Sequence, residues 1–395
     1  MKILFDYQIF ELQKFGGVSR YFIELLNHTN KEGIDWELPI RYSDNEQINN
    51  LEYFKGKLEN KADPFKTFLG GLDFIGKWKL YNLYSKISSL PTPKNLNTIL
   101  SIKSIIDGNF DIFHPTYYDD YFLPYLKNKP FILTIHDLIF EKYGKQYTLN
   151  DPSSINKKKL ANKATIIIAV SENTKKDIIE VLGIDERKIE VIYLGNSLVA
   201  NSHSDIMKEK LNIPEKYLLF VGNRANYKNF NLFIQAIAPL LINDKELNVI
   251  CTGKEFDEEE VSRLSSLFIK GQVFHRYVDD ESLACLYTYA IAFVFPTLYE
   301  GFGLPVLEAF SCGCPAILSN NSSLPEIGGD AAVYFNPKDE KSIFEAVKKV
   351  LQNNQLRENM KQKGREREKL FSWNITTKKT IKLYERVLSD SFTAI

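Results

Sequence analysis

The stretch that decides the fold is IAFVFPTLYEGFGLPVLEAFSCG, residues 291–313. Its first residues, Ile291–Phe295, form an apolar run typical of a parallel strand buried on both faces. A loop with Gly301 and Gly303 follows, and glycine lets a backbone approach a ligand closely. A helix is then expected from Leu304–Pro305, since proline suits the first helical turn. Because a helix N-terminus presents free N–H groups and partial positive charge, this order of elements predicts an anion-binding loop.

Two carboxylates flank this loop, Glu300 before the helix and Glu308 within it. A carboxylate accepts two hydroxyl hydrogen bonds, which suits the diol of a ribose or a hexose. The alternative is structural, with Glu300 capping the helix and Glu308 on its surface. The spacing alone leaves both interpretations open.

Similar apolar runs recur along the chain and alternate with amphipathic helical patterns, which predicts βαβ units and doubly wound parallel sheets. The pattern lapses over 195–214, and a new strand begins at Tyr217. We therefore predict an α/β protein with a first Rossmann-like domain over residues 1–197 and a second over 198–372. A terminal helix over 373–395, beginning at Trp373, completes the chain. Strands are expected at 2–5, 131–135, 165–170, 190–193, 217–221, 248–251, 291–295 and 315–318, and helices at 18–26, 173–182, 230–241, 282–290 and 342–351.

The composition narrows the class of protein. The 395 residues are 44% hydrophobic and 25% charged, as in globular proteins, and the formal net charge is zero. A nucleic-acid-binding protein normally shows a basic surplus, so no nucleic-acid partner is expected. The four cysteines lack metal-ligand spacing and are interpreted as core residues in a reducing compartment. With no signal peptide and no apolar run near the ~20 residues of a membrane helix, we expect a cytoplasmic protein.

Residues 52–106 differ from the rest, with nine lysines against four acidic residues and six interleaved aromatic residues from Phe65 to Tyr84. Basic and aromatic side chains together suit an anionic lipid surface, which predicts a peripheral contact with the inner face of the cytoplasmic membrane. A helical insertion with a solvated lysine face is the favoured interpretation, because charge runs usually lie on the surface.

A second polar loop, FVGNRANYKNF over residues 220–230, follows the first strand of the second domain. Open α/β sheets bind ligands at the carboxyl ends of strands. Gly222 begins the loop, and Arg224 and Lys228 offer a planar fork and a point charge that both suit a diphosphate. The structural alternative is two surface cations.

Two further loops of the first domain complete the set of candidates. Gly16 and Gly17 precede the first long helix, a weak signal that equally fits a turn, and Arg20 in that helix is able to reach an anion. His136 follows a buried strand and stands at its carboxyl end, where a ligand contact and a structural role are equally expected. His114 ends another strand-like run and is a further candidate for the cleft.

The segment Phe293–Pro337 as a whole resembles the signature of the retaining glycosyltransferases of family 4, which have the GT-B fold of two Rossmann-like domains facing across a cleft. Their hallmark is two glutamates separated by seven residues, which Glu300 and Glu308 match. The segments AVSENTKKDI and VIYLGNSL, at 169–178 and 191–198, resemble the family as well. The family often has Asn-Gly after VIY, whereas this chain has Leu194–Gly195–Asn196. FSW at 371–373 resembles its usual lead-in to a helix that crosses back onto the first domain.

The resemblance implies roles for the candidate residues. Catalytic roles would fall to Glu300, near the reacting centre, to His136, on the donor hexose, and to Arg224 and Lys228, on the diphosphate. Glu308 would hold the ribose hydroxyls of the nucleotide. The remaining donor contacts would come from Gly16, Gly17, Gly222, Gly301, Phe302, Gly303 and Leu304, in the last four through the backbone. No D-x-D triplet occurs in the chain, so we expect no metal and no cofactor beyond the nucleotide diphosphate sugar.

The expected activity is transfer of a hexosyl group, from GDP-mannose or a UDP-sugar, to a hydroxyl of a glycan or lipid-linked acceptor in surface polysaccharide or lipopolysaccharide biosynthesis. The first domain would bind the acceptor and the second the donor. Two alternatives stay open: another sugar-nucleotide enzyme on the same fold, or a non-catalytic protein that binds a glycan or a partner.

Overall fold

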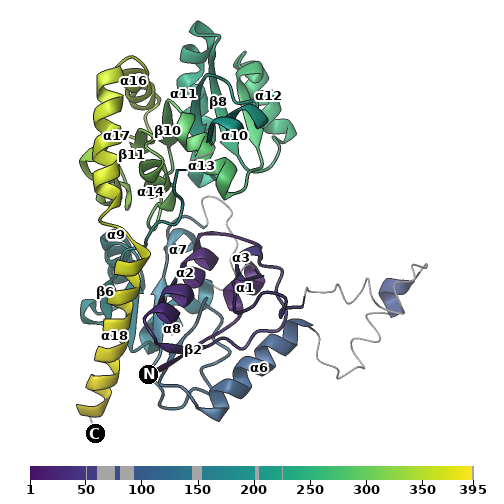
Figure 1. Ribbon diagram of the computed structural model, residues 1–395, viewed down its shortest axis with the longest axis vertical. Coiled ribbons are helices and arrows are strands. Elements are labelled where there is room, and N and C mark those ends of the chain that lie inside the picture. The colour runs from purple at the N-terminus through teal and green to yellow at the C-terminus, as the bar shows by residue number, and fades with distance from the viewer. Residues whose placement is uncertain are drawn as a thin grey trace.

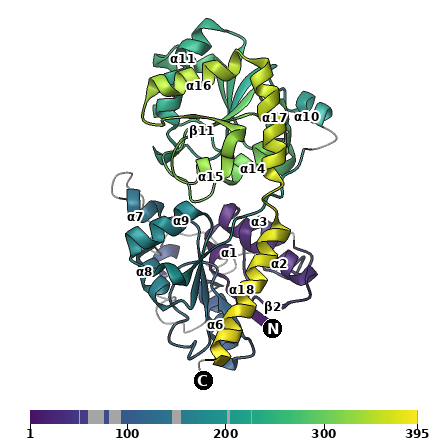
Figure 2. The same cartoon turned by 90° about the vertical axis from the view of Figure 1, so that its left-hand side faces the viewer.

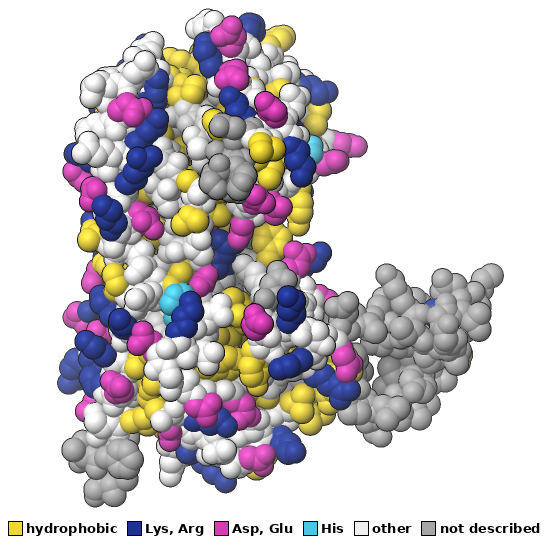
Figure 3. Space-filling view, in the orientation of Figure 1, with side chains coloured by type: hydrophobic (Ala, Val, Ile, Leu, Met, Phe, Trp, Pro, Cys, Tyr) yellow, Lys and Arg dark blue, Asp and Glu magenta, His cyan; other side chains and the backbone are white. Residues whose placement is uncertain are grey.

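The computed structural model of the protein describes residues 1–49, 51–59, 76–80, 93–144, 154–200, 204–224 and 226–393. Two α/β domains lie one above the other along the long axis of the molecule (Figure 1). Much of the insertion expected at 52–106 lies outside the described residues. On the face shown in Figure 3, acidic and basic side chains are interspersed over both domains, in keeping with the zero net charge.

The first domain contains two parallel three-stranded groups. One has the order β2-β1-β3, and the other has the order β4-β5-β6. A parallel bridge between Phe113 and Phe131 joins the two groups at β3 and β4. The resulting order, β2-β1-β3-β4-β5-β6, is that of a doubly wound sheet whose direction reverses beside β1. The strands are β1 (Lys2–Phe5), β2 (Asp35–Glu37), β3 (Ile112–His114), β4 (Ile132–Ile135), β5 (Ile166–Ala169) and β6 (Ile189–Val191).

The second domain has one parallel sheet with the order β12-β11-β10-β7-β8-β9. This is the Rossmann order, and the direction of winding reverses between β7 and β10. The strands are β7 (Lys216–Phe220), β8 (Leu247–Thr252), β9 (Val273–Arg276), β10 (Ala292–Phe295), β11 (Ala316–Ser319) and β12 (Ala332–Phe335). The α/β prediction with two Rossmann-like domains is confirmed, and β2, β3, β9 and β12 are additions to the expected strands.

Helices cover both sheets. Those of the first domain are α1 (Gln8–Leu12), α2 (Gly17–Lys31), α3 (Glu46–Asn49), α6 (Pro93–Asp107), α7 (Ile139–Tyr143), α8 (Ser154–Lys163) and α9 (Glu172–Asp177), which continues as a π-helical turn, Ile178–Leu182. Those that follow are α10 (Ser204–Lys210), α11 (Phe230–Asn243), α12 (Glu258–Ser266), α13 (Asp280–Tyr289), α14 (Leu304–Ser311), α15 (Leu324–Gly328), α16 (Glu340–Leu351), α17 (Asn354–Glu368) and α18 (Trp373–Thr393). In the part of the chain that is described, no helix combines the length and apolarity needed to span a bilayer.

The chain crosses between the domains twice. It leaves the first domain after β6, and it returns between α17 and α18, so that α18 runs along α2 (Figure 2). The two crossings touch, because a Cβ atom on Gly195 would lie 2.1 Å from the backbone N of Trp373. The indole N–H of Trp373 donates a hydrogen bond of 2.8 Å to Ser197 Oγ. Glycine is therefore the residue that fits at 195, where the sequence departs from the family pattern.

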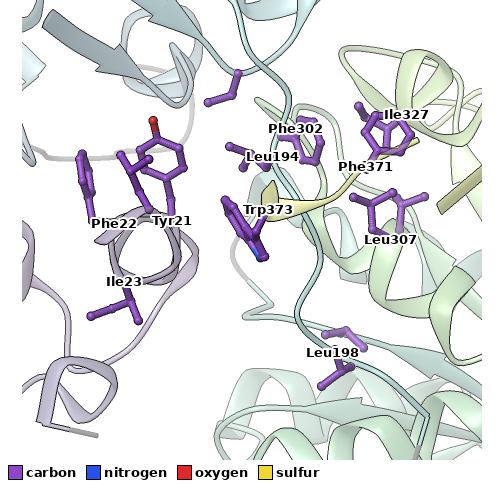
Figure 4. Packing of buried hydrophobic residues seen from close by; sticks show 14 of the residues in the cluster. Tyr21, Phe22, Ile23, Leu194, Leu198, Phe302, Leu307, Ile327, Phe371 and Trp373 are labelled. Carbon is purple, nitrogen blue, oxygen red and sulfur yellow. The ribbon is translucent and has the colours of Figure 1, made fainter. Parts of the chain in front are cut away.

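One hydrophobic cluster continues through both domains at these crossings (Figure 4). The Trp373 ring lies 6.1 Å from Tyr21 of α2. The ring centroid of Phe302, from the loop before α14, lies 6.0 Å from that of Phe371. The cysteines at 251, 285, 312 and 314 are free and buried in the second domain, as expected of core residues.

Candidate active site

The carboxyl ends of the two sheets face each other, and the expected site residues lie in the loops that follow them. In the second domain, Gly222 follows β7 and Glu300 follows β10. These are the strands between which the winding reverses, and ligands of such sheets bind at that point. In the first domain, the chain from β1 leads to Gly17 at the start of α2, and His136 follows β4 directly.

A pocket of about 330 Å³ lies between the domains and brings together several of the expected donor residues. Gly16, Gly17 and Arg20 line it from the first domain. Gly222, Leu304 and Glu308 line it from the second domain, with Phe15, Gln47, Val221, Asn223, Thr252, Gly253, Tyr277, Val278, Asp280, Leu283 and Pro305 around them. The domains are close here, because a Cβ atom on Gly17 would lie 3.6 Å from Leu304 Cδ1.

The loop before α14 has the backbone that its glycines predict. Gly303 is the N-cap of α14 and has φ 99°, in the left-handed region that side chains disfavour. Gly301 packs on the loop after β4, and a Cβ atom there would lie 1.8 Å from the carbonyl oxygen of His136. The free N–H groups at the start of α14 are thereby held beside the pocket, where an anion would meet them.

This loop is also hydrogen-bonded to the first domain. The carbonyl of Gly301 accepts from Ser171 Oγ at 2.6 Å and from Thr174 Oγ1 at 3.0 Å. Ser171 is the N-cap of α9, as expected. Glu326 of α15 accepts from the backbone N–H groups of Glu172 and Asn173, at 2.7 and 3.2 Å. A carboxylate of one domain thus caps a helix of the other, and the donor loop is positioned by both.

Lys228 and Glu300 form an ion pair at the edge of this loop. Lys228 Nζ lies 2.6 Å from Glu300 Oε1, and the two side chains are 13% and 15% exposed. Burial is the largest single influence on Lys228 and lowers the pKa of its amine. The charge and hydrogen bond of Glu300, together with Tyr227 and Asp137, more than offset it, so the pKa is raised. A Cβ atom on Gly222, which lines the pocket, would lie 4.0 Å from Lys228 Cε, so the pair lies next to the pocket.

Glu308 is buried at the floor of the pocket and accepts a hydrogen bond of 3.1 Å from the Tyr287 hydroxyl. Arg20 Nη1 lies 3.6 Å from Glu308 Oε1 across the domain boundary. Burial raises the pKa of the carboxyl, against the opposing effects of Arg20 and Tyr287. Glu308 is therefore not the surface helix residue of the structural alternative.

His136 lies against the loop that carries Gly301 but, like Lys228 and Glu300, it is not among the residues that line the pocket. Its ring packs edge-on to Tyr21, with 5.0 Å between centroids. Its Nε2 atom is buried and has no hydrogen-bond partner among the described residues. Burial, followed by the charge of Lys157, lowers the pKa of His136 to about 3, so the ring is neutral at physiological pH. A buried neutral nitrogen without a partner is uncommon unless a ligand completes it.

The structure gives two of the expected residues other surroundings. The Arg224 guanidinium bonds to Glu260 of α12, at 2.6 Å, and to the carbonyls of Lys254 and Glu255. Its side chain is 2% exposed and does not line the pocket, so its contact with a diphosphate stays a prediction. His114 is buried, with hydrogen bonds to Tyr384 and Thr134, and thus does not line the cleft.

Several residues that line the pocket were not among the candidates predicted from the sequence. Thr252 is the last residue of β8, an expected strand, and Gly253 follows it, so the rule that ligands bind at the carboxyl ends of strands points to both. Tyr277 and Val278 follow β9, whose sequence VFHR has too little apolar pattern to predict a strand. Asp280, at the start of α13, carries no signal in the sequence.

Two facing Rossmann-like domains with a pocket between their sheet ends define a protein of the GT-B class. Among solved structures, sucrose-phosphate synthase from Thermosynechococcus elongatus has the same fold, with a TM-score of 0.73 and 19% identity over 99% of this chain and 100% of that one. The Anabaena protein HepE in complex with UDP and glucose matches with a TM-score of 0.70 and 17% identity, over 98% of this chain and 100% of that one.

Both domains match glycosyltransferase families. Residues 203–367 match the family described as Glycosyl transferases group 1, and residues 74–198 match Glycosyltransferase Family 4. The O-antigen chain mannosyltransferase B of Escherichia coli is 33% identical over 56% of this chain and 61% of its own length. The serotype-specific mannosyltransferase WbdA of Escherichia coli is 28% identical over 66% of this chain and 34% of its own length. The chain thus spans less than two thirds of each of these relatives.

Proposed function

We propose that the protein transfers a hexosyl group from a nucleotide diphosphate sugar to a hydroxyl of a glycan or lipid-linked acceptor, in surface polysaccharide biosynthesis. The observation that carries this proposal is the pocket between the domains, where the helix start at Gly17 and the helix start at Leu304 converge near the buried Glu308. Helix N-termini suit a diphosphate, and a buried carboxylate suits a ribose diol.

In this proposal, the donor lies across the pocket with its nucleotide in the second domain. Gly16, Gly17 and the backbone from Gly301 to Leu304 bind the diphosphate, and Glu308 accepts hydrogen bonds from both ribose hydroxyls. His136 contacts the hexose through Nε2, which is buried without a partner among the described residues. A neutral imidazole either donates to or accepts from a sugar hydroxyl, which fits its lowered pKa of about 3.

The transfer step breaks the bond between the anomeric carbon and the diphosphate oxygen, and its electron pair leaves with the diphosphate. The acceptor oxygen bonds to the same face of the carbon, and its proton passes to the departing phosphate, which retains the configuration. Lys228 stabilises the developing negative charge, and Glu300 stabilises the oxocarbenium-like sugar. In the structure these two charges lie 2.6 Å apart and neutralise each other. No metal or cofactor enters this scheme.

GDP-mannose is the first donor to test, because the curated relatives include mannosyltransferases that act on O-antigen chains. The acceptor is proposed to be a growing glycan chain, free or carried on a lipid. A cytoplasmic enzyme with such an acceptor works at the inner face of the membrane. Exposed basic and aromatic side chains of the described part of residues 52–106 support that location: Lys55, Lys57, Lys79, Tyr53 and Trp78. Lys77 is buried and does not contribute.

Thermal unfolding with UDP, GDP, ADP and their common sugar forms tests the donor site. A ligand at 100 times its dissociation constant adds about 2.7 kcal/mol, and the midpoint rises by a few degrees. We expect a rise with one base. The rise should be smaller in Glu308→Gln and unchanged in Arg386→Met, whose exposed pair with Glu190 joins α18 to β6 and does not line the pocket. No rise with any nucleotide from folded protein contradicts the proposal.

Transfer is then measured with the stabilising donor, a lipid-linked oligosaccharide acceptor and EDTA. The expected product carries an α- or β-linkage that matches the donor, as read from its anomeric proton coupling. An epimerised sugar nucleotide instead supports the alternative of a different enzyme on this fold. Turnover that EDTA abolishes contradicts the metal-independent scheme.

A further inference from the structure

Arg20 reaches across the pocket from the first domain to two carboxylates of the second. It stands in the first turns of α2, one turn after the Gly16–Gly17 pair, and its side chain is 17% exposed. Its Nη2 donates to both oxygens of Asp280, at 2.7 and 2.6 Å. Its Nη1 lies 3.6 Å from Glu308 Oε1. The hydrogen bonds of the guanidinium thus go to the opposite domain.

Arg20 differs in charge and in origin from the other groups that face Glu308. Asp280 and Tyr287 approach from α13, and Cys312 stands at the end of α14 itself. Burial and the charge of Asp280 both disfavour an ionised Glu308, while Tyr287 contributes a neutral hydrogen bond. Arg20 is the cation among these groups, and it comes from the other domain. The negative charge of this buried carboxylate therefore depends on how the domains are placed.

We propose that Arg20 is a positioning residue of the donor site, which keeps Glu308 ionised and oriented for the ligand's diol only while the two domains are closed. The inference rests on the proposed function, because it assigns Glu308 to the nucleotide. Asp280 holds the outer side of the guanidinium, which fixes the direction of Nη1. An ionised carboxylate accepts from both hydroxyls, whereas a protonated one uses an oxygen as a donor, so the diol is bound well only in the ionised form.

This inference links nucleotide affinity to domain closure. When the domains separate, Glu308 loses its cation while it remains packed against Tyr287 in its own domain. The carboxyl then takes up a proton more readily, and its affinity for the diol falls. Closure and nucleotide binding therefore favour each other, as linkage between two equilibria requires.

The test is the affinity of the full chain for UDP, GDP and ADP, measured by calorimetry from pH 5.5 to 8.5 in wild type, Arg20→Met and Arg20→Lys. We expect Arg20→Met to bind the preferred nucleotide about tenfold more weakly at pH 7, or about 1.4 kcal/mol. The loss shrinks as the pH rises, because a carboxyl with a raised pKa is more fully ionised at higher pH. Arg20→Lys, which keeps the charge, recovers most of the affinity. Arg386→Met is the matched control, since it removes an arginine from an exposed pair elsewhere.

A double-mutant cycle keeps the inference testable whatever Arg20→Met does to stability. In a Glu308→Gln background, Arg20→Met should have no further effect on affinity, because there is no charge left to hold. Unchanged affinity in Arg20→Met, or a loss of equal size at every pH that persists in the Glu308→Gln background, overturns the inference. Wild-type protein that binds no nucleotide at any pH overturns the proposed function first, and the two failures are thus distinct.

Discussion

Replacing Gly301 by alanine tests how closely the donor loop must approach the first domain. The added Cβ atom would lie 1.8 Å from the carbonyl oxygen of His136 and 2.9 Å from Asp137 Cβ. The first of these atoms is backbone, so no side-chain rotation relieves the contact. The loop that carries Glu300 must therefore move away from His136 by about 1 Å or more, a displacement that costs on the order of 100-fold in rate when reacting groups are involved.

The stability change follows from the same contacts. Overpacking of this kind costs about 1–3 kcal/mol. The movement also stretches the hydrogen bonds that Ser171 and Thr174 donate to the Gly301 carbonyl, which contribute about 1 kcal/mol each. We expect a midpoint of unfolding several degrees below wild type, and turnover reduced about 100-fold at saturating donor.

The matched control is Gly271→Ala, since a Cβ atom on Gly271 meets nothing within 4 Å. Both variants add one methyl group, and they differ in what that group touches. Thermal unfolding and initial rates of transfer are measured side by side. If Gly301→Ala matches Gly271→Ala in midpoint and rate, the close approach of the two loops is not required for activity and the reasoning is wrong.

Three further predictions address the chemistry, the pH dependence and the membrane. Glu300→Gln and Lys228→Met each lower turnover by about 10²–10³-fold with near-native circular dichroism, because each removes a charge that acts on the transition state; wild-type rates in either variant contradict the assigned roles. His114 and His136 both have their pKa lowered from 6.5 to about 3 by burial, so their contribution to stability is complete above pH 6.5 and is lost as the pH falls toward 3. Denaturant titrations should show about 1.4 kcal/mol less stability per histidine at pH 5.5 than at pH 7.5, and His114→Gln should halve that loss; equal stability of wild type at the two pH values counts against it. The triple variant Lys55→Glu, Lys57→Glu, Lys79→Glu should co-sediment less with anionic vesicles than Lys245→Glu, Lys338→Glu, Lys341→Glu, a control of equal charge in the second domain; equal sedimentation favours a solvated surface.

The sequence was informative wherever apolar pattern and strand ends carried the signal. The apolar run at 291–295 and the glycines after it predicted β10, the loop and the start of α14. The long sequence segment around Glu300 that resembles the family pointed to the function. Helix α17 was not expected, because only Met360 and Gly364 of its fifteen residues are buried and no apolar stripe results. Short or polar elements such as β9 were not predicted either, because they too carry no clear apolar pattern.

The pairing of side chains from distant segments could not be predicted from the sequence. Arg224 was expected on a diphosphate, but α12 brings Glu260 to it, 36 residues away. The cap that Glu326 places on α9 joins residues more than 150 positions apart. The first contact depends on how α12 packs within the second domain, and the second depends on the angle between the domains; no local pattern encodes either. The pairing of Arg20 with Asp280 and Glu308 is of this kind as well.

The return of the chain to its first domain sets an order of synthesis. Helix α18 covers α2, yet it follows the whole second domain along the polypeptide. On the ribosome, the first domain emerges with the face that receives Tyr384 and Trp373 still open to water. The nascent first domain must therefore wait, with that apolar surface unprotected, until about two hundred further residues have been made. Its folding is completed only when the second domain is ready to join it.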